Sequence, residues 1–168
     1  MTIKISVVGT KGGIGKTSLA VNLGAYLADC GLLVLLIDAD PQPTSSGYYP
    51  LEFRAPGGLT TLLVESTRTG VVGPQVVAQS ISHTAIERLH IVLSDDPEAR
   101  LHDWIRDTPD GRLRLRYILD KALDQKYDVI LIDTQGAVGG LQGMDRSRDA
   151  NLIAQELRRE SFGRRPRR

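Results

Sequence analysis

Short apolar runs alternate along this chain with longer segments in which apolar residues recur every three or four positions. Residues 2–8 are rich in β-branched side chains and predict a strand, and the continuous apolar run 32–37 predicts a second strand buried on both faces. Residues 16–30 predict a helix that ends at Gly31, because glycine is common just after a helix C-terminus. Its apolar positions recur at helical spacing: Leu19, Ala20, Leu23 and Leu27. Strand, helix and strand form a βαβ unit.

The same alternation continues after residue 50. Further strands are expected at residues 89–93 and 127–132, and further helices at residues 59–65, 97–107 and 112–125. Asp96 is placed to cap the helix at 97–107. Residues 41–50 predict a polar loop, and residues 66–88 receive no assignment. The alternation predicts an α/β fold of three layers, with a mainly parallel sheet whose strands are joined by right-handed crossovers.

The composition fits one globular domain and excludes several classes of protein. The chain has 168 residues, of which 41% are hydrophobic and 24% are charged, which is enough for one core. Cys30 is the single cysteine, which excludes an intrachain disulfide and a cysteine-rich metal site and fits a reducing cytoplasm. The longest apolar run has six residues, far fewer than the roughly 20 of a membrane-spanning helix, so we expect no membrane partner.

The charge is distributed unevenly along the chain. The formal net charge is +1, but residues 145–168 carry eight Arg against four acidic residues, which leaves residues 1–144 at −3. We therefore divide the chain into a domain at residues 1–144 and a basic C-terminal segment at residues 145–168. Within this segment, residues 151–157 predict a short amphipathic helix, and residues 158–168 predict a disordered basic tail.

A glycine-rich loop follows the first predicted strand and opens the first predicted helix. Glycines let the backbone wrap a phosphate, so that its N–H groups and the helix N-terminus point at the oxygens. The residues expected to bind the phosphates are Gly12, Gly13, Ile14, Gly15, Lys16, Thr17 and Ser18. Lys16 is placed to pair with the β- and γ-phosphates, and the Thr17 hydroxyl to bind Mg²⁺. The alternative interpretation is a tight turn without a ligand.

Two aspartates directly follow two of the predicted apolar strands. Asp38 comes after the run 32–37, and Asp133 comes after the run 127–132. Ligands of parallel α/β sheets bind beyond the carboxyl ends of the strands, so we expect the glycine-rich loop and both aspartates to converge there. Taken singly, each aspartate is equally compatible with a strand-end turn or a helix cap.

Three motifs resemble those of one family of ATPases. KGGIGKT at residues 11–17 is similar to the deviant Walker A motif of the ParA/MinD-type ATPases, in which a lysine, here Lys11, precedes the glycine pair. DADPQ at residues 38–42 is similar to the switch I segment of the ParA/Soj branch. YDVILIDTQG at residues 127–136 resembles a Walker B strand that runs into switch II. The resemblance therefore implies the three-layer P-loop NTPase fold.

The resemblance also implies an ATPase that uses ATP or ADP and Mg²⁺. Lys11 would reach across a nucleotide-sandwich homodimer to the phosphates of the second subunit, and Asp40 would orient the attacking water. Asp38 and Asp133 would support the hydration shell of Mg²⁺ together with Thr17. The family further implies a cytoplasmic, nucleoid-associated protein that binds DNA non-specifically as an ATP-bound dimer. Such a protein would act with a ParB-like partner in partitioning a plasmid, a chromosome or a mobile element.

The resemblance ends at about residue 142, before the C-terminal strands of the family. In that family, the loops of those strands supply the adenine pocket and much of the DNA-contacting surface. Two alternatives therefore stay open: a nucleotide-binding interaction module that does not hydrolyse ATP, and a MinD-like positioning ATPase. The second needs a C-terminal helix with an apolar face, for which residues 151–168 offer only Leu152, Ile153, Leu157 and Phe162. His83, His90 and His102 are expected to be surface or packing residues.

Overall fold

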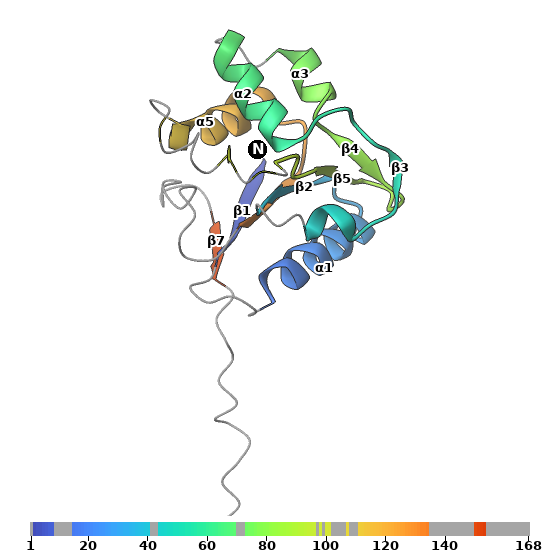
Figure 1. The fold of residues 1–168 in the computed structure, drawn as a ribbon. Helices are drawn as coiled ribbons and strands as arrows, with labels where there is room; N and C mark the ends of the chain where they lie inside the picture. Colours follow the sequence, from blue (N-terminus) through green and yellow to red (C-terminus); the bar gives the residue numbers. More distant parts are fainter. Residues whose placement is uncertain are drawn as a thin grey trace, which may run out of the picture.

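One twisted sheet organises the chain in the computed structural model, which describes residues 2–8, 15–40, 44–69, 73–96, 98, 100–101, 107, 111–134 and 150–153. Among these residues the sheet has seven strands in the order β3-β4-β5-β2-β6-β1-β7 (Figure 1). The strands are β1 (Ile3–Val8), β2 (Val34–Ala39), β3 (Leu51–Phe53), β4 (Ser82–Thr84), β5 (Leu89–Val92), β6 (Val129–Thr134) and β7 (Ala150–Ile153).

Parallel pairing dominates the sheet. Strands β5, β2, β6, β1 and β7 run parallel to one another, and β4 and β3 extend the sheet at the β5 edge through antiparallel pairs. Strand β2 lies between β5 and β6, where its side chains are covered on both faces, which explains its continuous apolar run. The predicted α/β fold with a mainly parallel sheet is confirmed.

Helices cover both faces of the sheet and complete three layers (Figure 1). Helix α1 (Lys16–Asp29) lies on one face. Helices α2 (Leu59–Thr69), α3 (Pro74–Ala78) and α5 (Gly111–Ile118) lie on the other, and α5 continues into a π-helical turn (Leu119–Leu123). The predicted helices at residues 16–30 and 112–125 are thus confirmed, and the one at residues 59–65 extends to Thr69.

The strands alternate their side chains between two cores. On β2, Val34 and Leu36 pack in the core beneath α1, whereas Leu35 and Ile37 pack in the core beneath α2 and α5. Strand β6 does the same, with Val129 and Leu131 on the α1 side and Ile130 and Ile132 on the other. All of these side chains are at most 3% exposed. The sheet is therefore rigidly held where β2 and β6 end.

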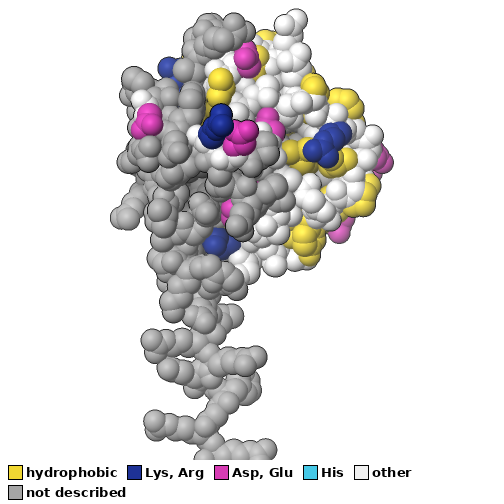
Figure 2. All heavy atoms as spheres, viewed as in Figure 1, with side chains coloured by type: hydrophobic (Ala, Val, Ile, Leu, Met, Phe, Trp, Pro, Cys, Tyr) yellow, Lys and Arg dark blue, Asp and Glu magenta, His cyan; other side chains and the backbone are white. Residues whose placement is uncertain are grey.

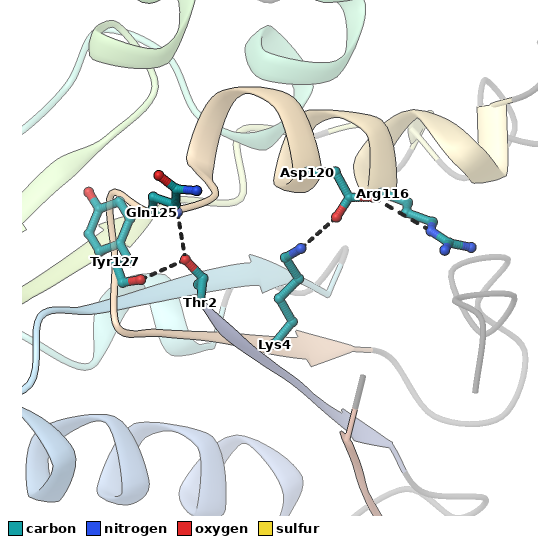
Figure 3. Close-up of polar contacts among 6 residues, drawn as sticks. All are labelled: Thr2, Lys4, Arg116, Asp120, Gln125 and Tyr127. Carbon is teal, nitrogen blue, oxygen red and sulfur yellow. Dashed lines mark hydrogen bonds and ion pairs between the residues drawn. The ribbon is translucent and has the colours of Figure 1, made fainter. Parts of the chain in front are cut away.

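Polar contacts fasten β1 to the segment between α5 and β6 (Figure 3). The Thr2 hydroxyl donates to the Tyr127 carbonyl at 2.7 Å and accepts the Gln125 N–H at 2.8 Å. Lys4 Nζ lies 2.5 Å from Asp120 Oδ1, and Arg116 Nε lies 3.7 Å from Asp120 Oδ2. The contacts of Thr2 and Lys4 join residues more than 110 positions apart in the chain, whereas Arg116 and Asp120 are four positions apart.

The structure differs from the sequence-based expectations at the C-terminal segment and at the sheet edge. Residues 151–157 were expected to form a short helix, but Ala150–Ile153 form strand β7, which pairs with β1. The sequence of so short a segment does not distinguish a helix from a strand. Residues 150–153 form a strand because they pair with the edge of β1 that β6 leaves open. Strands β3 and β4 were not predicted. The helix expected at residues 97–107 lies mostly outside the described residues.

Asp96 accepts hydrogen bonds from residues inside that segment. Its carboxylate receives the N–H groups of Arg100 at 2.9 Å and Leu101 at 2.7 Å, whereas the cap of a helix that begins at residue 97 would receive those of residues 98 and 99. The predicted cap of the helix at residues 97–107 therefore stays a prediction. Within the part of the chain that the structure describes, no helix has both the length and the apolar character needed to cross a membrane.

Candidate functional site

The N-terminus of α1 lies where the sequence predicts the phosphate site. Gly15 precedes the helix with φ of +80° and ψ of +24°, a left-handed conformation that glycine adopts without steric strain. Among the described residues no side chain caps the helix, and its first turn contains no acidic residue. Its first N–H groups are therefore left for an anion, which the helix dipole also favours.

Lys16 and Thr17 open this helix beside the carboxyl edge of the sheet. Lys16 is only 9% exposed, although lysine side chains are rarely buried unless they pair with a negative charge. Thr17 is half-buried, and its hydroxyl lies close enough to Asp133 to influence the pKa of that carboxyl group. Ser18 is exposed in the same turn. Lys11, Gly12, Gly13 and Ile14 lie outside the described residues, so their predicted roles stay predictions.

Asp38 and Asp133 lie side by side at the ends of β2 and β6. The two strands are parallel, and the two aspartates are partners in their register. Both side chains are fully buried. Two adjacent buried carboxylates repel each other and are costly to keep ionised, which is typical of a site that binds a cation.

Asp38 is surrounded by hydrogen-bond donors from the loop that follows β2. Its Oδ2 accepts both the N–H of Ser46 at 2.7 Å and the hydroxyl of Ser46 at 2.6 Å. Its Oδ1 accepts the N–H of Asp40 at 3.3 Å. Burial raises the pKa of Asp38 above its ordinary value, and the hydrogen bonds from Ser46 and Asp40 oppose this rise.

Asp133 has no such support. Neither of its carboxylate oxygens makes a hydrogen bond with the described residues, and the buried hydroxyl of Ser45 likewise has no partner there. Burial raises the pKa of Asp133 to about 6. The hydroxyls of Thr17 and Ser45 oppose this rise from positions short of hydrogen-bond geometry, whereas the charges of Asp38 and Asp40 add to it.

This donor set fits a hydrated divalent cation. Mg²⁺ prefers hard oxygen ligands and keeps several of its waters. The carboxylate oxygens of Asp133 lie near the Thr17 hydroxyl at the carboxyl edge of the sheet and have no hydrogen bond with the described residues. Among the described residues, no group of three His, Cys, Asp or Glu side chains could hold a metal by itself. A cation here would therefore need further oxygens from water or phosphate.

The structure thus brings together most of the predicted site residues that it describes. Thr17, Asp40 and Asp133 interact electrostatically, Asp38 is the register partner of Asp133, and Lys16 adjoins Thr17. Sequence reasoning missed three serines that contact this site, Ser45, Ser46 and Ser94. Ser45 and Ser46 form a 3₁₀ turn (Ser45–Gly47) inside the predicted polar loop. Polar residues of a loop carry no signal that separates a site residue from a solvated one.

A comparison with known protein families identifies the family of this chain. Residues 2–148 match a family model, AAA_31, described as an AAA domain. The chain belongs to this family. The matched region runs from β1 through the glycine-rich loop to β6. It therefore includes all the residues of the candidate site.

Curated relatives confirm the resemblance to ParA/Soj proteins. The AAA_31 chain is 31% identical over 135 residues to the sporulation initiation inhibitor protein Soj of Bacillus subtilis, which covers 80% of this chain and 50% of that protein. It is 33% identical over 132 residues to the chromosome-partitioning ATPase Soj of Treponema pallidum, covering 79% of this chain and 48% of that protein. The chain spans about half the length of these relatives.

Solved structures agree with the fold. Cobyrinic acid a,c-diamide synthase from Mycobacterium smegmatis, solved with bound ADP and magnesium, has a TM-score of 0.66 and 27% identity, covering 84% of this chain and 54% of that one. The ATP complex of a Cyanothece McdA variant has a TM-score of 0.68 over 83% of this chain and 50% of that one, at 24% identity. The second likeness shows the fold alone.

Proposed function

We propose that this AAA_31 chain binds ATP with Mg²⁺ at the carboxyl edge of its sheet. The observation that carries the proposal is the buried carboxylate of Asp133, which has no hydrogen bond with the described residues and lies beside the uncapped N-terminus of α1. A bound Mg²⁺ would neutralise phosphate charge and restrain the phosphate oxygens. The magnesium and nucleotide in the M. smegmatis relative are consistent with this assignment.

Each residue of the site has a defined task in this proposal. The N–H groups of the first turn of α1 bind phosphate oxygens, and Lys16 adds a positive charge against the β- and γ-phosphates. Thr17 contributes a hydroxyl to the cation, and Asp133 accepts hydrogen bonds from its water ligands. The charges of Asp38 and Asp133 also keep the site closed to an anion that arrives without a cation.

Calorimetry with ATP, ADP and Mg²⁺ tests the nucleotide assignment. Lys16→Ala should reduce the affinity at least about a hundredfold, since it removes a buried charge that pairs with phosphate. Lys121→Ala is the matched control because Lys121 is exposed on the π-helical turn. Equal binding by the wild type and Lys16→Ala would contradict the phosphate site.

We further propose slow ATP hydrolysis that depends on Asp40 and Lys11. Asp40 follows β2 directly and adds a charge near Asp133, and we infer that its carboxylate lies close enough to the cation to orient the attacking water. The assignment of Lys11 to the second subunit of a homodimer rests on the motif resemblance. Asp40→Ala should keep ATP binding and lose turnover, whereas unchanged turnover in both Asp40→Ala and Lys11→Ala would refute this mechanism.

A nucleotide-binding module without turnover is the second candidate function. The chain spans about half the length of the Soj relatives. The motif resemblance implies that strands which complete the family's sheet lie beyond the part that this chain shares with them. A wild type that binds ATP in calorimetry but releases no phosphate favours this candidate.

The cellular role that we propose is partition of DNA. It rests on the relatives, of which one is named a chromosome-partitioning ATPase. In this role the ATP-bound chain forms a homodimer, binds DNA non-specifically, and acts with a ParB-like partner in the cytoplasm or on the nucleoid. Sedimentation with ADP and with a non-hydrolysed ATP analogue tests the dimer. A monomer under both conditions would remove the ATP-dependent dimer from the proposal.

A further inference from the structure

A closed ring of hydrogen bonds holds the segment that carries Asp40. Asp38 Oδ2 accepts the hydroxyl of Ser46 at 2.6 Å, and Ser46 Oγ in turn accepts the N–H of Ser94 at 2.8 Å. The Ser94 hydroxyl donates to the Asp40 carbonyl at 3.0 Å. The Asp40 N–H closes the ring on Asp38 Oδ1 at 3.3 Å.

The ring joins three segments that are separate in the chain. Asp38 lies at the end of β2 and Asp40 directly follows that strand, Ser46 belongs to the 3₁₀ turn, and Ser94 to the residues that follow β5. Ser94 uses both its N–H and its hydroxyl, and Ser46 both donates and accepts through one oxygen. The peptide groups of Asp40 are consequently held on both sides, the N–H by Asp38 and the carbonyl by Ser94.

The ring also separates the tasks of the two buried aspartates. The carboxylate oxygens of Asp38 accept hydrogen bonds from the N–H of Asp40 and from both the N–H and the hydroxyl of Ser46. Asp133, in contrast, makes no hydrogen bond with the described residues. Asp38 is thus built as an anchor for the loop, and Asp133 is left for the cation and its waters. The motif resemblance alone gave both aspartates the same role.

We propose that Ser46 and Ser94 are positioning residues that fix the backbone of Asp40, Ser46 through Asp38 and Ser94 through its hydrogen bond to the Asp40 carbonyl. A general base must be held close to its productive geometry, because a misplacement of about 1 Å can reduce a rate a hundredfold. The catalytic consequence of this inference rests on the proposed hydrolysis. The positioning itself does not, because it is a property of the nucleotide-free chain.

Hydrogen–deuterium exchange of the full chain without nucleotide tests the positioning. The peptide that spans residues 38–46 should exchange several-fold faster in Ser46→Ala and in Ser94→Ala than in the wild type. Ser46→Thr keeps the hydroxyl and should restore the wild-type rate. Ser80→Ala is the control, because Ser80 is buried away from the ring and its hydroxyl also donates to a backbone carbonyl, that of Val76 in α3, at 2.8 Å. Unchanged exchange in both alanine variants at Ser46 and Ser94 would overturn the proposal.

Steady-state ATPase kinetics test the consequence. The kcat of Ser46→Ala and Ser94→Ala should fall between about 10-fold and 100-fold, while KM for ATP and the Kd from calorimetry stay within about twofold. A parallel loss of kcat and ATP affinity, unrescued by Ser46→Thr, would show a general structural defect and overturn the proposal. A wild type without turnover would contradict the proposed hydrolysis, and the exchange experiment would then decide the positioning by itself.

Discussion

Asp133, which we propose to hold the water ligands of a cation, also affects the stability of the fold. A carboxyl group whose pKa is higher in the folded chain stabilises the fold fully below its unfolded value of 3.8, and this stabilisation is lost as the pH rises through about 6. At neutral pH the folded chain therefore keeps a buried charge without a hydrogen-bond partner among the described residues. The protein retains a stability cost at the position where a cation would remove it.

The variant Asp133→Asn should separate stability from binding. We expect the nucleotide-free protein to become more stable at pH 7 by about 1–3 kcal/mol, because the substitution removes the buried charge and keeps the shape. The same variant should lose the increase in nucleotide affinity that Mg²⁺ provides. Thermal unfolding and calorimetry measure the two effects, and a destabilised variant would contradict the account of Asp133 as an unpaired charge.

Two histidines on neighbouring strands, His83 on β4 and His90 on β5, pack against each other. The rings of His83 and His90 stack with centroids 4.2 Å apart, and His90 Nδ1 lies 2.9 Å from the Tyr127 hydroxyl. Burial, and then the charge of His83, lower the pKa of His90. The expectation that these histidines are packing residues is correct for this pair.

This pair predicts a pH dependence of stability. A histidine whose folded pKa is lowered contributes stability that is complete above its unfolded value of 6.5 and is lost as the pH falls toward the folded value. The contribution of His90 to the free energy of unfolding should thus decline between pH 7 and pH 5.5, opposite in sign to the contribution of Asp133 over the same range. His90→Gln should remove this contribution and make the protein gain more stability, or lose less, as the pH falls from 7 to 5.5, and His83→Gln, which removes only the smaller cause, should have a smaller effect in the same direction. Urea titrations at several pH values give the slopes, and an identical slope in His90→Gln would reject this origin.

At the scale of elements, one carboxylate connects the sheet to α2. Asp95 follows β5 and accepts the N–H groups of Gly58 at 2.8 Å, Thr60 at 2.6 Å and Thr61 at 3.3 Å, as well as the Thr61 hydroxyl at 3.0 Å. It therefore acts as an N-cap that comes from a distant part of the chain. Its neighbour Ser94 contacts the Asp40 segment, so two consecutive residues fasten β5 to both α2 and the site.

Asp95→Ala should destabilise the protein by about 1–2 kcal/mol, because it leaves several N–H groups at the start of α2 without an acceptor. Glu98→Ala should change stability by less than about 0.5 kcal/mol, because the Glu98 side chain is exposed and pairs with the exposed Arg100. The midpoints of urea unfolding compare the two variants. An Asp95→Ala midpoint equal to that of Glu98→Ala would mean that α2 does not depend on this cap.

The elements also show where sequence reasoning succeeds and where it stops. Strands β2 and β6 were predicted within two residues, because each is an apolar run followed by an aspartate and is buried on both faces. Strand β7 was predicted as a helix because its conformation comes from pairing with β1, about 145 residues earlier. Strands β3 and β4 have three residues each, too few for a periodic pattern.

The candidate site divides in the same way. Lys16, Thr17, Asp38, Asp40 and Asp133 could be predicted because they sit in motifs or at strand ends. Ser46 and Ser94 could not, because they are 48 residues apart and meet only after β2 and β5 have paired. Their role depends on tertiary geometry that no local pattern encodes.

On the scale of the whole molecule, the positive charge is concentrated in sequence rather than on the described surface. Figure 2 shows the described Lys and Arg side chains of one face separated from one another and interspersed with Asp and Glu. Residues 158–168 carry Arg158, Arg159, Arg164, Arg165, Arg167 and Arg168 against Glu160. Such a cluster can neutralise phosphates and release counterions, and it can equally keep a domain soluble without binding anything.

Deletion of residues 158–168 should distinguish these two roles. If the cluster binds DNA, the deletion should reduce the slope of log affinity against log salt by several units, because each arginine–phosphate contact contributes about 0.9. A shift assay at several salt concentrations measures the slope with a fixed DNA length. Identical slopes for the full chain and the deletion variant would leave the tail as a solubilising segment.

The order of the strands in the sheet also determines when each strand can pair during translation. Strand β1 leaves the ribosome first, yet its neighbours are β6 and β7, which begin at Val129 and Ala150. Its N-terminal anchor, Thr2, likewise waits for Gln125 and Tyr127 (Figure 3). Strand β1 therefore has no partner in the sheet until β6 has been synthesised, a period in which association with other chains competes with folding.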